Sequence, residues 1–411
     1  MDKLRPDQGL AEQVLKETGR IIDACGPRIT GTEACRKSAK MLADRLGKVC
    51  DKVFTEEFSI HPASFLSFMK YYAVSYAVSL VLLFMDGALV YTAAVLLAAG
   101  ALLSLSQFVL YKEFFDFAHP KKSAVNVYGT IEPEGPVRQQ IIVSGHHDSA
   151  FEFNFLASRF QKYYAIRITA GVLCYLVLCG AVIVWAYLQA KTGHPPAFSR
   201  AVVWLGLAGS LVVLPFYRFV SDKESPGAGD NMVASVMAAE LAGLFTKDGG
   251  GALRHTRIIA ASFDAEECGL RGSRDFARRH KLELHAIPTY VLNIDSIYEL
   301  AEIKLLISDL NGFTRLSKTM ARQCRDTAHA LGYGARLQPM VFGGGATDAA
   351  EFAAIGVPAT TLLAMKTTHI REGLAYHTCK DTVDSIEPPA VAACLDIAYH
   401  YILLKDRAVR D

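Results

Sequence analysis

Four long apolar runs restrict the folds open to this chain. They cover about residues 66–85, 88–110, 168–188 and 201–219. Each is close to the ~20 residues of helix that cross a bilayer. Hydrophobic residues make up 51% of the 411 residues and charged residues 20%, which is too apolar for an ordinary soluble enzyme. Burial of all four runs in the core of a soluble protein is the alternative, but they would overfill a core of this size. The sequence therefore predicts four transmembrane helices.

The apolar runs form two pairs, each joined by a short polar turn at 85–87 or 191–196. Two hairpins return the chain to its starting side, so residues 1–65, 111–165 and 220–411 are expected on one face of the membrane. Basic residues gather on that face, and the opposite face has few. The flanking basic residues are Arg5, Lys70, Lys112, Lys121, Lys122, Lys162, Arg167, Arg218 and Lys223. This bias, with an N-terminus that lacks a signal peptide, predicts a multi-pass protein of the cell membrane whose large part and both termini are cytoplasmic.

The remaining sequence alternates between helix and strand patterns. Strands are expected at 53–60, 124–131, 140–144, 257–263, 289–294 and 359–363. Helices are expected at 8–24, 33–47, 231–245, 272–279, 312–331 and 348–354, and Thr32 could cap the second of these. This alternation predicts an α/β fold, in which helices sandwich a mixed, mostly parallel sheet with its ligand site at the carboxyl ends of strands.

Seven side chains in five short stretches could carry chemistry. They are His146, Asp148, Asp230, Glu266, Glu267, Asp295 and His377. Each has an ordinary structural alternative: Asp230 could cap a helix, the histidines could be core or surface residues, and paired glutamates are common on surfaces. Adjacent carboxylates repel each other unless a cation neutralises them. Taken together at consecutive strand ends, these residues suit a borderline-soft divalent metal such as zinc.

The order of these motifs resembles that of the two-zinc exopeptidases of metallopeptidase family 28. The shared motifs are His-x-Asp, Asp-Asn, Glu-Glu-x-Gly-x-x-Gly-Ser, an Asp at a strand end, Gly-x-Pro-Ala and Tyr-His-Thr. The resemblance runs through the non-membrane portion, from Gly26-Pro27-Arg28 to Asp381-Thr382. It implies a zinc exopeptidase fold divided into a peptidase domain at 1–65, 111–165 and 220–411, with inserted transmembrane hairpins at 66–110 and 166–219.

The resemblance also implies a role for each site residue. His146, Glu267, Asp295 and His377 would be terminal ligands of two Zn²⁺ ions, with Co²⁺ or Mn²⁺ as other candidate metals. Asp230 would bridge the ions, Glu266 would act as general base, and Asp148 would orient His146. His147 is expected to point elsewhere. One departure is Ala349, where the family often has His after Asp, so a contact in the substrate pocket is in question.

The expected function is that of a membrane-bound zinc aminopeptidase acting on short apolar peptides. A carboxypeptidase or dipeptidase of the same family stays open, as do a one-zinc glutaminyl-cyclase-like transferase and a non-catalytic receptor. The expected partners are a peptide substrate and the lipid bilayer, with a homo-oligomer through the membrane helices as an option. Nearly balanced charge (Lys+Arg 43, Asp+Glu 41) and the lack of a nucleic-acid motif exclude nucleic acid as a partner. The polar loop with His369, Arg371 and Glu372 is expected to be solvated surface or a contact for a substrate terminus. Gly343-Gly344-Gly345 is expected to let backbone approach the site.

Overall fold

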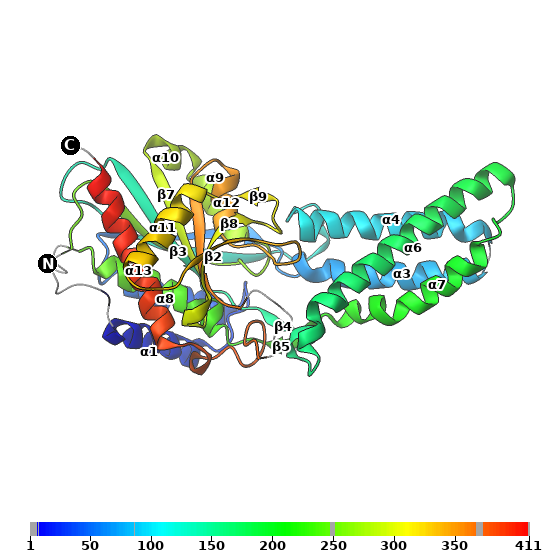
Figure 1. Ribbon diagram of the computed structural model, residues 1–411, viewed down its shortest axis with the longest axis horizontal. Helices are drawn as coiled ribbons and strands as arrows, with labels where there is room; N and C mark the ends of the chain where they lie inside the picture. The colour runs from blue at the N-terminus through cyan, green and yellow to red at the C-terminus, as the bar shows by residue number, and fades with distance from the viewer. Residues whose placement is uncertain (1–5, 7, 86, 247–250, 367–372, 410–411) are drawn as a thin grey trace.

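The computed structural model describes residues 6, 8–85, 87–246, 251–366 and 373–409. An α/β body occupies one end of the molecule, and four long helices project from it as a bundle (Figure 1). The loop residues His369, Arg371 and Glu372 lie outside the described residues, so the expectation for that loop stays a prediction.

The body is built on one mixed sheet. Its strands follow the order β1-β2-β6-β3-β7-β11-β8-β10, and the short β9 pairs with β8. The central strands β6, β3, β7 and β11 are parallel neighbours. β1 and β2 pair antiparallel with their neighbours, and β8 is antiparallel to β11 but parallel to β10. The bounds are β1 Lys52–Ile60, β2 Lys122–Ile131, β3 Gln139–His146, β6 Thr256–Phe263, β7 Thr289–Ile297, β8 Ile303–Asp309, β9 Thr314–Arg315, β10 Arg336–Pro339 and β11 Ala359–Ala364.

The predicted α/β sandwich is confirmed, because helices cover both faces of this sheet. Apolar residues of α1 Gln8–Cys25, α2 Glu33–Leu46, α8 Val233–Gly243, α11 Lys318–Ala330 and α13 Pro388–Ala408 pack in the larger core. Those of α9 Arg271–Arg279, α10 Lys281–Ala286 and α12 Ala349–Ala354 pack in a second core on the other face. The Thr32 cap is also confirmed, since its hydroxyl accepts a hydrogen bond from the Cys35 amide.

The predicted helix at 312–331 is wrong in its first part. Residues 314–315 form β9, and α11 begins only at Lys318, where Ser317 caps it. The strand β8 and its neighbour β10, which forms one edge of the sheet, were not predicted. Their apolar stretches are too short to show an alternation that would distinguish a strand from a loop. Whether such a stretch forms a strand depends on the strands beside it.

The four projecting helices coincide with the four apolar runs. They are α3 Phe68–Met85, α4 Val90–Ser104, α6 Tyr164–Thr192 and α7 Ser199–Val213. A π-helical turn, η3 Leu105–Val109, continues α4, and a 3₁₀ turn, η6 Leu214–Arg218, continues α7. With these extensions, four segments are long and apolar enough to cross a membrane: Phe65–Met85, Val90–Val109, Gln161–Thr192 and Ser199–Arg218. The bundle has an apolar core of its own.

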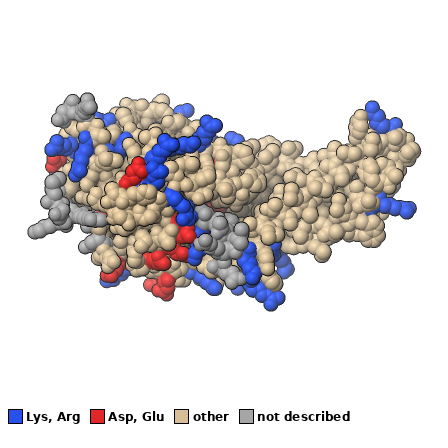
Figure 2. Space-filling model, in the orientation of Figure 1, with Lys and Arg blue, Asp and Glu red and all other residues tan. Residues whose placement is uncertain are grey.

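The surface of the bundle differs from that of the body. Along most of its length Figure 2 shows neither basic nor acidic side chains, while basic residues gather near its junction with the body and at its far tip. Many large apolar side chains on these helices are exposed, including Trp204 at 68% and Leu211 at 81%. An apolar exterior of this extent is typical of lipid-facing helices rather than of a soluble protein.

Candidate metal centre

The site lies at one edge of the central parallel strands. His146 is the last residue of β3, and Glu266 and Glu267 follow β6. Asp295 lies inside β7, which continues three residues further than predicted, to Ile297. Asp230 lies in the turn η7 Ala228–Met232 that leads into α8, and His377 lies in the loop after β11. The carboxyl ends of adjacent parallel strands meet at one edge, and this brings residues far apart in the sequence together.

These side chains form two groups that share Asp230. One group is His146, Asp230 and Asp295, and the other is Asp230, Glu267 and His377. One Asp230 carboxylate oxygen lies 3.3 Å from His146 Nε2, and the other lies 3.1 Å from His377 Nε2. Asp230 does not cap α8, which begins without a side-chain cap. Its carboxylate therefore stands between the two histidines, one oxygen toward each.

Glu266 belongs to neither group that contains Asp230, but it forms a third group with His146 and Glu267. Its carboxylate is 3.8 Å from His146 Nε2 and lines the same cavity as Asp230, Glu267 and Asp295. Glu267 instead faces His377, with 3.2 Å between a carboxylate oxygen and Nε2. Glu267 thus groups with both histidines, while Glu266 groups with His146.

Asp148 is fully buried and connects the stretch after β3 with the Glu266-Glu267 turn. One of its oxygens lies 3.3 Å from His146 Nδ1. Its carboxylate also accepts hydrogen bonds from the Glu266 and Glu267 amides at 3.2 and 3.1 Å and from the Thr30 hydroxyl at 3.0 Å. A carboxylate on the second ring nitrogen fixes the orientation and tautomer of a metal-ligating histidine.

Two buried charged residues that the sequence did not single out hold the Asp230 turn. Asp381 accepts hydrogen bonds from the Gly229 and Asp230 amides at 2.7 and 3.2 Å. Arg28 donates to the carbonyls of His147, Pro226 and Gly227, each at 2.7 Å. Both belong to the first and last motifs of the family resemblance. No pattern in the sequence shows that their side chains are buried and bonded to backbone groups.

The electrostatics of the site show an excess of negative charge. Burial opposes protonation of His377, but Glu267 and Asp230 outweigh it and raise its pKa to about 10. Burial, together with the charges of Asp295 and Glu267, raises the pKa of Glu266 well above its usual value despite His146. Both raised pKa values arise because several carboxylates are crowded in a buried space. A bound divalent cation would reduce the repulsion between these carboxylates.

The donor set fits two divalent metals. His146 Nε2, His377 Nε2, one Glu267 oxygen and one Asp295 oxygen are buried without a hydrogen-bond partner. The histidine nitrogens face carboxylate oxygens at 3.1 to 3.3 Å but lack hydrogen-bond geometry. Two groups of imidazole nitrogen and carboxylate oxygen, joined by one carboxylate, suit zinc.

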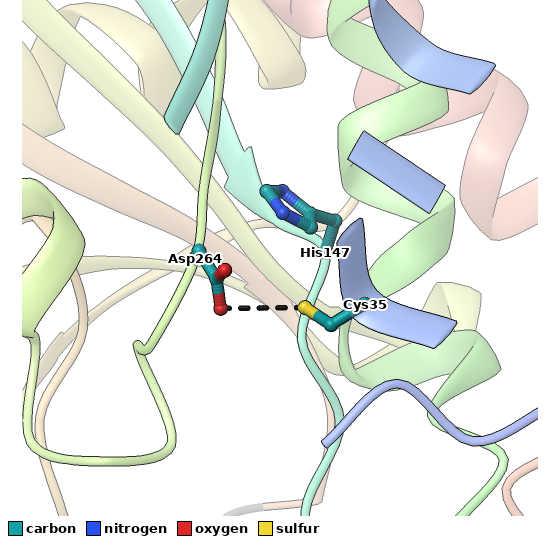
Figure 3. A group of neighbouring side chains, drawn as sticks. All are labelled: Cys35, His147 and Asp264. Atoms are coloured by element: carbon teal, nitrogen blue, oxygen red, sulfur yellow. Dashed lines mark hydrogen bonds between the residues drawn. The ribbon is translucent and has the colours of Figure 1, made fainter. Parts of the chain in front are cut away.

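A fourth group shares no residue with these three and has a different character. Cys35, His147 and Asp264 are buried side by side, from α2, the end of β3 and the turn after β6 (Figure 3). The Cys35 thiol donates to Asp264 at 3.3 Å, and burial holds its pKa well above the usual value. His147 Nδ1 pairs with the Ser262 hydroxyl at 2.8 Å. His147 Nε2 is buried without a hydrogen-bond partner. His147 belongs to none of the groups that contain Asp230, in line with the expectation that it points elsewhere.

A cavity of about 390 Å³ connects the site with the helical bundle. Asp230, Glu266, Glu267, Asp295 and His377 form its floor. Its walls come from α3, η3, α6 and η6 and from the loop at 342–346, which includes the three glycines. Phe153 packs edge-on against the His377 ring with 4.3 Å between centroids, so apolar residues reach the site itself.

Comparison with known proteins agrees with this geometry. The family described as "Peptidase family M28" matches residues 214–402. A zinc aminopeptidase from Bacillus subtilis superposes with a TM-score of 0.56 at 15% identity, covering 97% of this chain and 96% of the other. A zinc-dependent exopeptidase from Parabacteroides distasonis gives 0.54 at 13% identity, covering 97% and 98%. A glutaminyl cyclase from Bacteroides thetaiotaomicron gives 0.56 at 12% identity, with the same coverage. No curated protein sequence matches the chain. The structural likenesses show a zinc exopeptidase fold.

Proposed function

We infer that this chain is an integral-membrane metallopeptidase of family M28, an exopeptidase that uses two zinc ions. The family match over residues 214–402 supports this. The observation that carries the proposal is the position of Asp230, one oxygen toward each of two histidines, with Glu266 alongside. His146 and Asp295 would hold one ion and Glu267 and His377 the other, with Asp230 shared. When bound, zinc supplies a Lewis acid and lowers the pKa of water so that a nucleophile is available near neutral pH.

Glu266 is proposed as general base. Its carboxylate lies on the cavity side of His146 and is bonded to neither histidine. It would take the proton of the attacking water and deliver it to the leaving amine. The hydrogen bond from its backbone amide to Asp148 fixes the turn that carries it. Asp148 thus serves as a positioning residue for both His146 and Glu266.

The charges around the cavity support an aminopeptidase rather than a carboxypeptidase. Among the described residues that line it, none is Lys or Arg, and all four acidic ones belong to the proposed site. A substrate α-carboxylate would find no cationic partner in this lining and would lose its hydration there. A free α-ammonium group would meet carboxylates instead.

The four long apolar helices support an integral-membrane protein. The basic residues that flank them on the side of the body support a cytoplasmic peptidase body. Because these helices also form the cavity walls, short apolar peptides are the proposed substrates. Transfer of one apolar substrate side chain from water into this cavity stabilises the bound complex by about 1.5–3 kcal/mol when the side chain is fully buried.

The test is a Glu266→Gln variant of the purified full-length protein. Amide hydrolysis should fall by at least about 100-fold, the lower range for general-base loss, while bound zinc, measured by mass spectrometry of the metal, stays unchanged. Glu283→Gln is the matched control, because its side chain is 78% exposed. Full activity in Glu266→Gln, or no hydrolysis by the wild type across a broad peptide library, would refute the proposal.

The same experiment separates the alternatives. A glutaminyl-cyclase-like enzyme would release ammonia from N-terminal glutamine with one zinc per chain, and a receptor would hydrolyse nothing. The arrangement of two metal-ligating groups joined by Asp230 favours the two-zinc hydrolase over both.

A further inference from the structure

The cavity above the site is shaped for one long apolar chain. Along α6 it is lined by Tyr164, Ile168, Val172 and Leu176, which lie four residues apart and therefore on one side of the helix. At 1.5 Å per residue these positions span about 18 Å. Phe68, Met69 and Tyr72 of α3 line it as well. The apolar space thus continues well beyond the reach of a single amino-acid side chain.

The far end of this space opens on the outer surface of the bundle. Tyr164, nearest the body, is 9% exposed, while Leu176 is 50% exposed. Leu105 of η3 also lines the cavity and is 46% exposed. In a membrane, the rim between η3 and α6 would face lipid. Phe313 and Phe342, both exposed, line the cavity beside the glycine loop on the body. A molecule could therefore place an apolar end toward lipid and a polar end toward the body.

The chemistry of the walls argues against a peptide backbone in the deep part. An extended peptide presents amide and carbonyl groups about every 3.3 Å. Each buried without a partner costs about 1–3 kcal/mol. The α6 stripe and the α3 side chains offer only tyrosine hydroxyls as polar groups, and the Tyr72 hydroxyl already donates to the Gly171 carbonyl. An alkyl chain makes no such demand and gains free energy with every buried methylene.

We propose that the substrate is a lipid-like amide, with a single long alkyl chain next to the scissile bond that lies along the α6 stripe. The inference rests on the proposed hydrolase function and names its substrate class. By carbon–carbon bond length, an 18 Å space holds a chain of about 12 to 16 carbons. Val172, in the middle of the stripe, is then a specificity-determining residue.

The test is a ladder of amides of increasing chain length, assayed on the zinc-loaded full-length protein in one lipid bilayer composition. One arm carries the alkyl chain on the acyl side of the amide, as in fatty-acyl amides of small neutral amines. The other carries it on the amine side, as in N-alkyl amides of leucine. In at least one arm, kcat/KM should rise about fourfold per methylene and then level off when the cavity is full.

Val172→Trp separates binding in the cavity from simple partitioning into the bilayer. The indole should fill the middle of the space, so kcat/KM stops rising at a shorter chain length than in the wild type. For the longest substrates, kcat/KM should fall at least about tenfold. The longest substrates should lose more than the shortest one, and unchanged bound zinc shows that the variant folds. Leu173→Trp is the matched control, because Leu173 is 56% exposed and does not line the cavity. If Val172→Trp fails to fold, Leu176→Trp tests the same stripe nearer the rim.

The outcomes are distinguishable. Short substrates hydrolysed with no dependence on chain length, or with identical ladders for wild type, Val172→Trp and Leu173→Trp, would overturn the lipid-amide proposal alone. No hydrolysis of any amide would overturn the hydrolase function itself.

Discussion

At the scale of single residues, the arrangement of the site depends on one carboxylate. Asp230 offers one oxygen to the His146 side and the other to the His377 side. Its backbone is held by Asp381 and by the carbonyl contacts of Arg28. The sequence predicted all seven candidate side chains, and the structure brings them together. It did not show how they divide into two groups, because that division depends on where side chains point.

Asp230→Ala should therefore affect metal content more than loss of a terminal ligand. Removing the shared carboxylate weakens both groups, so bound zinc should fall from two per chain to less than one. Asp295→Ala should leave about one, because the Asp230, Glu267 and His377 group stays intact. Metal analysis after dialysis measures both, with the exposed Asp222→Ala as control. Equal zinc loss in the two site variants would contradict the shared position of Asp230.

At the scale of elements, small residues set the packing of the four apolar helices. A methyl group added at Gly209 of α7 would lie 2.4 Å from the Tyr76 hydroxyl, which donates to the Gly206 carbonyl. At Gly206 it would lie 2.4 Å from Leu80, and at Gly171 of α6 it would lie 2.3 Å from the Phe216 ring. Close approach at small residues is how helices pack in membranes, where lipid is as apolar as the side chains.

Gly209→Ala should destabilise the bundle by about 1–3 kcal/mol, the usual cost of overpacking. Gly180→Ala on α6 is the control, because its added methyl group would meet nothing within 4 Å and alanine favours helix. Thermal unfolding of both variants in the same detergent measures the difference. A Gly209→Ala protein as stable as Gly180→Ala would show that α3 and α7 do not pack as described.

Element boundaries show where sequence patterns fail. Long periodic segments such as α1, α2 and the four apolar helices agree with the sequence within a few residues at most of their ends. The helix expected from residue 312 instead begins at Lys318, and β8 and β10 were missed. Short edge strands depend on the partners that accept their backbone hydrogen bonds, and those partners are distant in sequence.

At the scale of the whole molecule, two helical hairpins are inserted into one α/β body. The first leaves after β1 and returns before β2, and these strands pair antiparallel over Lys52–Ile60. The second leaves after His146 and returns before Asp230. Both hairpins project from the body in the same direction, and their helices pack together (Figure 1). Residues of these helices form the walls of the cavity above the site. The helical bundle therefore also forms part of the cavity.

The proposed topology places the body in the cytoplasm. Cys379 is exposed on the body, whereas the other cysteines are buried or half-buried. A membrane-impermeant maleimide should label Cys379 in inverted vesicles and not in right-side-out vesicles or intact cells. A cysteine introduced at exposed His194, in the turn between α6 and α7, should label with the opposite sidedness. Reversed labelling would place the body outside the cytoplasm.

The sequence by itself determined the classes of structure and chemistry. The length of the apolar runs predicts the four long helices. The periodicity of apolar residues, together with turn residues, predicts the α/β body, and the order of the short motifs indicates the candidate metal ligands. These signals are local, so a single chain reveals them. Only the tertiary structure decided which of these residues and helices contact one another. It set the two groups around Asp230, the buried support from Arg28 and Asp381, and the apolar cavity between the site and α6. Such contacts join residues tens to hundreds of positions apart, because adjacent parallel strands and packed hairpins converge on one edge of the sheet.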